Sequence, residues 1–237
     1  MSNTALWIIQ QACGELGLPT PTAVTGTTEE TNIQMLALLN SAGYDLASNY
    51  AWEELLRTQL LPINATDVLY ALPPDYNYYL DSTGWDRTNR WPLLGPVTAQ
   101  EWQALVAAKV QAVSRTYYRL NQKKLEFWPQ PVQDRDIALE YSSLYWVEDG
   151  NAPGTYKANI TQDADIPVLN EWLLVKLLKL KTWAAKGFDT TTLAAEFQNM
   201  FLSLSAKSKG SRTLSLAPKT GTVFIGVQNV PEGNWVR

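Results

Sequence analysis

Residues 167–187 are predicted to form a helix that is apolar on nearly every side. Asp165 stands where a helix cap is expected, Pro167 lies near the first helical position, and Gly187 ends the segment. Such a helix must be surrounded by protein, because no side of it is suited to water. Either the rest of the chain or neighbouring copies surround it, and the pattern leaves both open.

Three further amphipathic helices are predicted near the two ends of the chain. Residues 4–17 have apolar side chains at three- and four-residue spacings. The next helix starts where Thr27 and Glu30 have the spacing of a capping box, and it runs to about Asn49. The last helix is capped by Asp189. Its apolar stripe consists of Leu193, Phe197, Phe201 and Leu204.

The middle of the chain has the pattern of β-strands. Residues 117–120 and 125–128 flank a hairpin turn, and residues 137–147 alternate in part between apolar and polar side chains. One short helix is expected at 98–108, because Thr98 and Glu101 match a capping box. This region is therefore predicted to be a small antiparallel β unit.

The predicted fold class is α+β: an antiparallel helical bundle with an inserted small antiparallel β unit and an extended C-terminal arm. The bundle is assigned residues 1–54 and 165–209. The β unit with its one short helix is assigned residues 55–150, and the arm residues 210–237.

The arm is rich in Gly and Pro and has too little apolar surface to fold by itself. From Lys207 onward the chain has five basic residues and one acidic residue, whereas residues 1–206 have 14 basic and 22 acidic ones. An apolar-bearing tail is expected to dock on another protein, and a disordered tail is the alternative. The candidate docking residues are Leu214, Leu216, Phe224, Ile225, Val227 and Trp235.

The composition argues against catalysis. The chain has no His, and Cys13 is its one cysteine, which removes the commonest general base and the usual metal ligands. Adjacent acidic residues such as Glu53 and Glu54 do not face each other in a helix or a strand. We therefore expect no enzyme activity, no metal and no cofactor. We also expect no targeting segment and no membrane span.

The aromatic content indicates surfaces that meet other proteins. The chain has 10 Trp and 11 Tyr, which are favoured at interfaces. In residues 82–105, arginines interleave with tryptophans, which permits guanidinium groups to stack on rings. A local core that folds this connection is the alternative. The candidate subunit-interface residues are Trp85, Arg87, Arg90, Trp91, Trp172 and Trp183.

A narrow stripe of Lys176, Lys179 and Lys186 runs along the helix 167–187. A solvated face is the simplest interpretation. A cationic surface that faces an acidic partner or DNA is the alternative, and the spacing does not separate the two.

Several runs of the sequence together resemble a known family. Residues 72–76 read Leu-Pro-Pro-Asp-Tyr, and residues 85–102 contain Trp-Asp-Arg-Thr-Asn-Arg-Trp-Pro-Leu and Gly-Pro-Val-Thr-Ala-Gln-Glu-Trp. Residues 125–129 and 138–141 fit the same pattern with Leu-Glu-Phe-Trp-Pro and Ala-Leu-Glu-Tyr. On these residues the chain resembles the head-to-tail adaptor family of short-tailed bacteriophages, of the tail tubular protein A or tail accessory factor type.

The resemblance implies a homo-oligomeric ring of twelve copies beneath the portal protein. Such a ring extends the DNA channel and carries the tail nozzle and fibre proteins, and genomic DNA passes through it without sequence-specific binding. The C-terminal segments in this family tend to reach the portal, which suits an extended arm. The protein would be made in the host cytoplasm and reside in the virion at the head-tail junction.

The sequence leaves two other functions open. The first is that of another tail ring, such as a nozzle or a tail terminator, which would bind different neighbours. A carbohydrate-binding or cell-wall-cleaving tail protein would instead use the Trp-rich β unit. A DNA-binding protein is disfavoured by the net charge of -4 and the dispersed basic residues.

Overall fold

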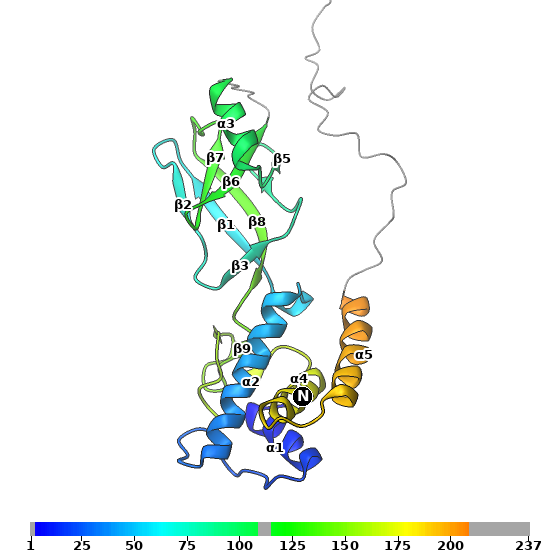
Figure 1. Ribbon diagram of the computed structural model, residues 1–237. Helices are drawn as coiled ribbons and strands as arrows, with labels where there is room; N and C mark the ends of the chain where they lie inside the picture. The colour runs from blue at the N-terminus through cyan, green and yellow to red at the C-terminus, as the bar shows by residue number, and fades with distance from the viewer. Residues whose placement is uncertain (1–2, 109–114, 209–237) are drawn as a thin grey trace, which may run out of the picture.

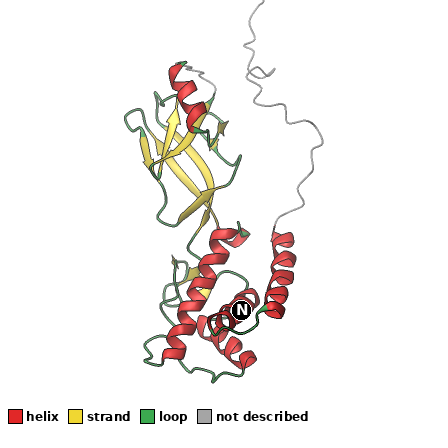
Figure 2. Cartoon of the chain, viewed as in Figure 1, coloured by secondary structure: helices red, strands yellow, loops and turns green. Residues whose placement is uncertain are grey.

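The computed structural model describes residues 3–108 and 115–208 of the protein. Four helices gather at one end of an elongated molecule, and a large sheet with one short helix occupies the other end (Figure 1 and Figure 2). The helices are α1 (Ala5–Leu16), α2 (Glu30–Asn49), the 3-10 helix η1 (Glu53–Leu55), α3 (Ala99–Ala107), α4 (Glu171–Ala185) and α5 (Thr191–Ser208). None of these described helices has the length and hydropathy needed to cross a membrane.

The described strands fall into two sheets. The larger sheet contains β1 (Leu56–Ile63), β2 (Leu69–Ala71), β3 (Tyr76–Tyr79), β4 (Trp85–Asp86), β5 (Trp91–Leu94), β6 (Thr116–Asn121), β7 (Lys124–Trp128) and β8 (Arg135–Ser143). The smaller sheet, which lies beside the helices, contains β9 (Val147–Glu148), β10 (Tyr156–Lys157) and β11 (Ile166–Pro167).

Helix α4 is the centre of the helical part. It contacts α1, α2 and α5, and its Leu173, Leu174 and Leu178 are buried. Burial of one leucine side chain stabilises the folded state by roughly 2 kcal/mol. The chain's own helices therefore cover the apolar helix, which decides between the two alternatives that the sequence left open.

The start of α4 differs from the prediction. The helix begins at Glu171, where the Asn170 side chain accepts a hydrogen bond from a backbone N–H of the first turn at 3.1 Å. Ile166–Pro167 forms strand β11 instead, and Asp165 is buried with its carboxylate 2.8 Å from the Lys157 ammonium. Asp165 therefore holds a loop together and does not cap the helix.

One of the two predicted capping boxes is confirmed. The Thr98 hydroxyl accepts a hydrogen bond from the backbone N–H of Glu101, whose carboxylate accepts one from the backbone N–H of Thr98. The box predicted for Thr27 and Glu30 is wrong. There Glu29 precedes the helix without a side-chain cap, and Thr27 accepts a hydrogen bond from the Glu29 N–H at 3.2 Å.

The larger sheet has the strand order β1-β8-β4-β5-β6-β7-β2, with β3 beside β8. Strands β5 and β6 run parallel, whereas the other described pairs are antiparallel. The sheet curls until its two ends approach each other, since the Gln59 amide donates a hydrogen bond to the Ala71 carbonyl at 3.3 Å. Tyr118, Leu125 and Ile137 are buried inside the curl.

The predicted fold class is therefore wrong. The structure is a mixed α and β fold whose larger sheet has eight strands and curls into a nearly closed, barrel-like form. The prediction was a helical bundle with an inserted small antiparallel β unit. Strands β2, β4 and β5 have two to four residues each, so they are too short to show alternation in the sequence. The segment 210–237 of the predicted arm lies outside the described residues.

The two ends of the molecule meet at a polar junction. The Asn77 amide of β3 donates hydrogen bonds to the carbonyls of Ala47 and Ser48 at the end of α2, both at 3.3 Å. The Asp75 carboxylate accepts hydrogen bonds from the hydroxyls of Tyr141 at 2.9 Å and Ser143 at 2.6 Å. The conspicuous Asp75 of the Leu-Pro-Pro-Asp-Tyr run thus has a structural role next to the junction.

Candidate protein interface

The short strands β4 and β5 form a hairpin that carries several of the candidate interface residues. Asp86 in β4 is 1% exposed, and its carboxylate accepts hydrogen bonds from the backbone N–H and the amide of Asn89, both at 2.8 Å. The Arg135 guanidinium lies 3.5 Å from the same carboxylate. These contacts fix the tight turn from which Arg87 and Arg90 extend.

The register of the sheet places an apolar row on its outer face. Leu60 pairs with Ala138, Ala138 with Trp85, and Trp85 with Pro92, so four strands contribute one residue each. Leu60 is 60% exposed and Trp85 is 48% exposed, whereas Ala138 lies buried between them. An exposed tryptophan in a row of apolar side chains is typical of a surface that contacts another protein.

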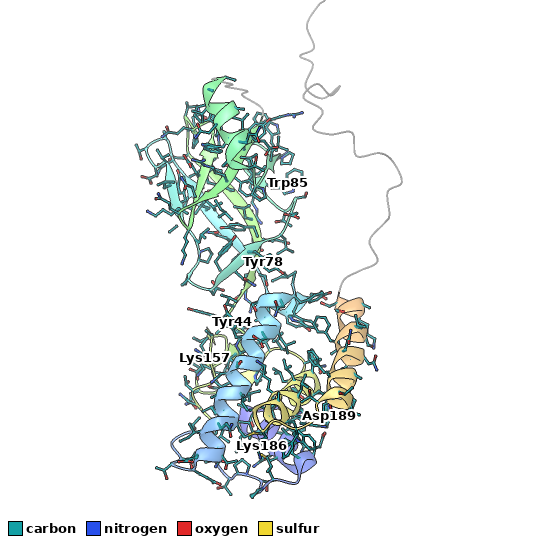
Figure 3. The ribbon with its side chains drawn as sticks, in the orientation of Figure 1. Tyr44, Tyr78, Trp85, Lys157, Lys186 and Asp189 are labelled. Carbon is teal, nitrogen blue, oxygen red and sulfur yellow. The ribbon has the colours of Figure 1, made fainter. Side chains whose placement is uncertain are left out.

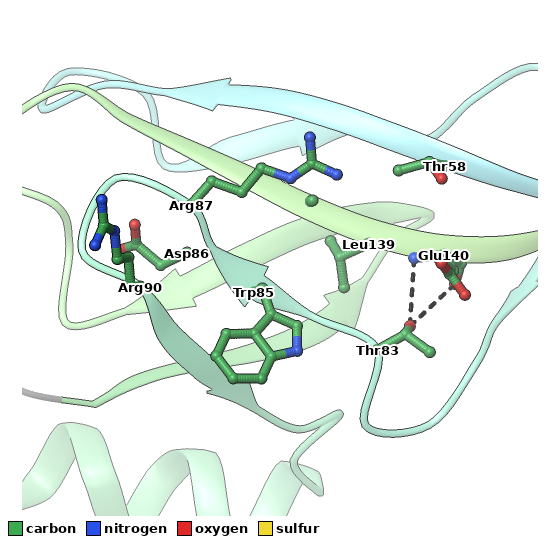
Figure 4. A pocket seen from close by; sticks show the side chains of 9 residues that line it. Thr58, Thr83, Trp85, Asp86, Arg87, Arg90, Leu139 and Glu140 are labelled. Carbon is green, nitrogen blue, oxygen red and sulfur yellow. Dashed lines mark hydrogen bonds between the residues drawn. The ribbon is translucent and has the colours of Figure 1, made fainter.

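A pocket of about 370 Å³ opens beside this row (Figure 4). Trp85, Arg87 and Arg90 border it on the hairpin side, and Glu140 of β8 borders it on the other side. The Thr83 hydroxyl accepts a hydrogen bond from the backbone N–H of Glu140 at 3.3 Å, which fixes the loop before β4. We call Leu60, Trp85, Arg87, Arg90 and Glu140 the hairpin surface.

The two arginines of the hairpin surface are unpaired. Both are exposed, and neither guanidinium group has a carboxylate, ring or hydrogen-bonding partner among residues 3–108 and 115–208. Stacked guanidinium groups occur elsewhere in the described chain, with Arg57 over Tyr156 at 4.6 Å and Arg119 over Trp102 at 4.3 Å. Arg87 and Arg90 are therefore free to pair with an external group.

The remaining candidate interface residues lie in other surroundings. Trp91 of β5 is half-buried opposite Asp86. Trp172, near the start of α4, is 47% exposed and meets Trp7 edge-on with 5.4 Å between the ring centroids. Trp183 is half-buried against the exposed ring of Phe188 at 5.2 Å. These last two belong to the helical part, whereas Trp85 lies on the sheet (Figure 3).

The lysine stripe on α4 is used mainly inside the chain. Lys176 pairs with Glu196 of α5 at 3.0 Å, and Lys179 pairs with Glu15 of α1. The hydrogen bond from Lys176 lowers the pKa of Glu196. Lys186 is exposed and has no ion pair in the described residues. Two of the three lysines thus connect helices of the same chain.

Two observations on the described residues concern metal binding and the reactivity of the thiol. No group of three His, Cys, Asp or Glu side chains among them is placed to hold a metal ion. Cys13 is buried as predicted, and burial raises the pKa of its thiol.

Sequence reasoning missed Leu60 and Glu140, which join Trp85 only through the sheet register. The partial alternation of residues 137–147, which include Glu140, was visible in the sequence, but the strand pairing was not.

Comparison with known proteins gave one family. The model of the family described as SU10 adaptor protein matches residues 3–219. The matched range includes both ends of the molecule, the junction and the hairpin surface. The comparison with curated proteins gave no match.

Proposed function

The chain belongs to the SU10 adaptor protein family and is thus a phage adaptor protein and virion component, and from this we propose that it forms a ring under the portal. The ring extends the DNA channel and carries the tail, with the nozzle and fibre proteins as further partners. The observation that carries the proposal is the family match over residues 3–219, which includes the helical part and the sheet alike. We further propose that the role is structural and needs no catalysis.

Ring formation needs two different surfaces on each copy that fit each other. The hairpin surface on the sheet is one candidate for such a contact, and the exposed Trp172, which meets Trp7 on the helical part, is a second and separate one. Tryptophan and arginine dominate the energetics of protein interfaces. Their exposure here supports subunit contacts, and a dodecamer is our proposed copy number.

We propose that the segment 210–237 docks each copy on a portal subunit. Its anchors would be the apolar residues Leu214, Leu216, Phe224, Ile225, Val227 and Trp235, all outside the described residues. The hydrophobic clusters of the described fold contain residues from Ala5 to Leu204, so the fold has cores that precede this segment. We also propose that the chain is divided into three units, which consist of residues 1–54 with 165–209, residues 55–150 and residues 210–237.

The net charge of -4 suits a channel wall that does not bind DNA tightly. Genomic DNA would pass without sequence-specific contacts. Repulsion between like charges keeps the duplex mobile along such a wall. The head-tail junction is the proposed location, and the host cytoplasm the proposed site of synthesis.

The rival functions predict other partners. A nozzle or tail terminator would bind another tail ring in place of the portal. A carbohydrate-binding or wall-cleaving protein would use exposed aromatic residues such as Trp85 to hold a glycan. The family match favours the adaptor, since the matched model describes an adaptor protein.

The test is a binding experiment with purified heads that carry the portal but lack a tail. We expect the full chain to bind these heads, and electron microscopy to show a ring directly below the portal. Removal of residues 211–237 should leave a folded subunit, judged by circular dichroism, that no longer binds. Replacing Phe224, Ile225 and Val227 by Ala keeps the arm length and should weaken binding as well.

Normal attachment of the truncated chain would contradict the docking role of the arm. Binding to an isolated nozzle but not to portal-bearing heads would contradict the adaptor position. Turbidity loss with cell walls, or retention on a glycan column, would favour the wall-directed alternative.

A further inference from the structure

The hairpin surface carries two guanidinium groups and one carboxylate, that of Glu140, and in the described residues neither arginine forms an ion pair with it. The nearest acidic residue in sequence, Asp86, is buried and accepts its hydrogen bonds from Asn89. Arg87 and Arg90 are exposed and border the pocket, and Arg87 extends along the strands toward Thr58 (Figure 4). The exposed indole of Trp85, which belongs to the apolar row, borders the same pocket. An acidic surface with room for an aromatic anchor is the natural complement.

The same chain has a strongly acidic region. Residues 1–54 contain six acidic residues and no Lys or Arg. Two of the six carboxylates, Glu15 and Asp45, form ion pairs with Lys179 and Lys181 of α4. The charges of these two carboxylates are thus balanced within the subunit.

Glu53 and Glu54 differ from these paired carboxylates. Both are exposed in η1, where α2 leads into the sheet, and neither carboxylate has an ion pair or hydrogen bond in the described residues. The backbone around them is fixed, because the Ser208 hydroxyl lies 3.3 Å from the Glu53 nitrogen and Arg57 donates to the Glu54 carbonyl at 3.0 Å. Adjacent side chains of a 3-10 helix point in different directions, so each of the two unpaired carboxylates is placed to meet a separate guanidinium group.

We propose that the hairpin surface of one copy binds Glu53 and Glu54 of a second copy. Arg87 and Arg90 pair with the two carboxylates, and Trp85 packs at the centre of the contact. The proposal rests on the ring proposed above and names its lateral contact. Because different surfaces of the two copies meet, the contact is heterologous, and its repetition around an axis closes a ring.

An exposed ion pair contributes little by itself. Here each contact adds two such pairs around a tryptophan that excludes water, and the ring repeats the contact in every copy. The contact also excludes wrong registers, since like charges would meet wherever the acidic regions of two copies face each other.

The direct test is a thiol cross-link in assembled particles. The double variant Arg90→Cys with Glu54→Cys is incorporated into particles and then treated with a bis-maleimide, because two cysteines that replace these long side chains are too far apart for a direct disulfide. We expect a ladder of cross-linked multimers of this chain on a denaturing gel. Either single variant, treated identically, should give no ladder. The buried native Cys13 should not contribute.

A charge exchange supplies the second measurement. Arg87→Glu with Arg90→Glu should lower incorporation into particles at least tenfold, as should Glu53→Arg with Glu54→Arg. All four substitutions together should restore most of it. Lys123→Glu with Lys124→Glu, in the β6–β7 turn, makes the same change in net charge away from the hairpin surface and should have no effect.

The outcomes separate this contact from the adaptor function. Particles that contain the double-cysteine chain but give no ladder would overturn the contact and leave the adaptor function intact. A cross-link to the portal or to a tail protein would show that another acidic partner occupies the surface. Absence of even the wild-type chain from particles would overturn both proposals. Failure of the fourfold variant to recover would also count against the pairing.

Discussion

Gly43 of α2 lies directly against the indole ring of Trp146, which is fully buried at the centre of the helical core. A Cβ atom at Gly43 would lie only 2.1 Å from the nearest atom of that ring. The glycine is therefore the residue that lets α2 approach the chain segment between β8 and β9.

Gly43→Ala should destabilise the protein by about 3 kcal/mol, because the rigid indole cannot move away within a packed core. Gly14→Ala is the matched control: Gly14 also lies inside a helix, and nothing lies within 4 Å of the position of its Cβ. That control should stabilise by about 0.5–1 kcal/mol through the helix propensity of alanine. Urea unfolding of both variants measures the difference, and equal stabilities would refute the close packing.

Asp86→Ala should lower stability by about 2 kcal/mol, since it leaves the partly buried partners of the buried carboxylate without an acceptor. It should also lower incorporation into particles, because Asp86 fixes the turn that presents Arg87 and Arg90. Arg87→Ala should change stability by less than about 0.5 kcal/mol, as expected for an exposed side chain, while still weakening assembly. Thermal unfolding and particle incorporation, measured on both variants, separate folding from assembly.

Acid should weaken the loop that contains Asp165. Burial alone raises the pKa of Asp165, but hydrogen bonds from Lys157 and from backbone N–H groups outweigh it and lower the pKa below 3.8. The folded state therefore binds this proton less well than the unfolded chain. The carboxylate contributes stability above pH 3.8, and that contribution is lost as the pH falls through the lowered pKa.

Asp165→Asn should accordingly cost most stability near neutral pH and progressively less in acid. Asp81→Asn, on an exposed turn, provides the control for removing one carboxylate. Urea unfolding from pH 7 down to pH 3 gives the two curves. A constant difference between wild type and Asp165→Asn across that range would contradict the assignment.

The hydroxyl of Tyr141 should ionise only at unusually high pH. Burial, followed by the hydrogen bond to Asp75, raises the pKa of its hydroxyl to about 12. Asp75→Ala removes the hydrogen bond and the negative charge, so the pKa of Tyr141 should fall while burial keeps it above 10.0. Carbon-13 NMR of labelled tyrosine follows this titration, with Tyr141→Phe to assign the signal. An unchanged pKa in Asp75→Ala would mean that the carboxylate does not face the phenol.

The helices and the central β-strands were readable from the sequence because each is long enough to show a period. The capping box at Thr98 and the burial of Cys13 were also predictable from local signals. The sheet was underestimated because β2, β4 and β5 are short and their partners are distant in sequence. Asp165 was misassigned for a related reason: its partner Lys157 belongs to the two-residue strand β10, which is too short to show a pattern.

The hairpin surface could likewise be predicted only in part from the sequence. Trp85, Arg87 and Arg90 stand out in the sequence, because charged and aromatic residues alternate around them. Leu60 and Glu140 enter the surface only through the pairing of β1 with β8 and of β8 with β4. Residue type therefore indicated the centre of the surface, and topology decided its borders.

Helix α1 packs against α4, and the amide of Asn3 donates a hydrogen bond to the Glu171 carboxylate 168 positions later. During translation, α1 and α2 must wait for the whole sheet to be synthesised before α4 leaves the ribosome, a delay of roughly 6–25 s at ordinary bacterial elongation rates. The sheet can fold in that interval, whereas the apolar faces of the first two helices stay uncovered. Nascent chains halted before residue 171 should therefore be favoured clients of the ribosome-associated chaperones.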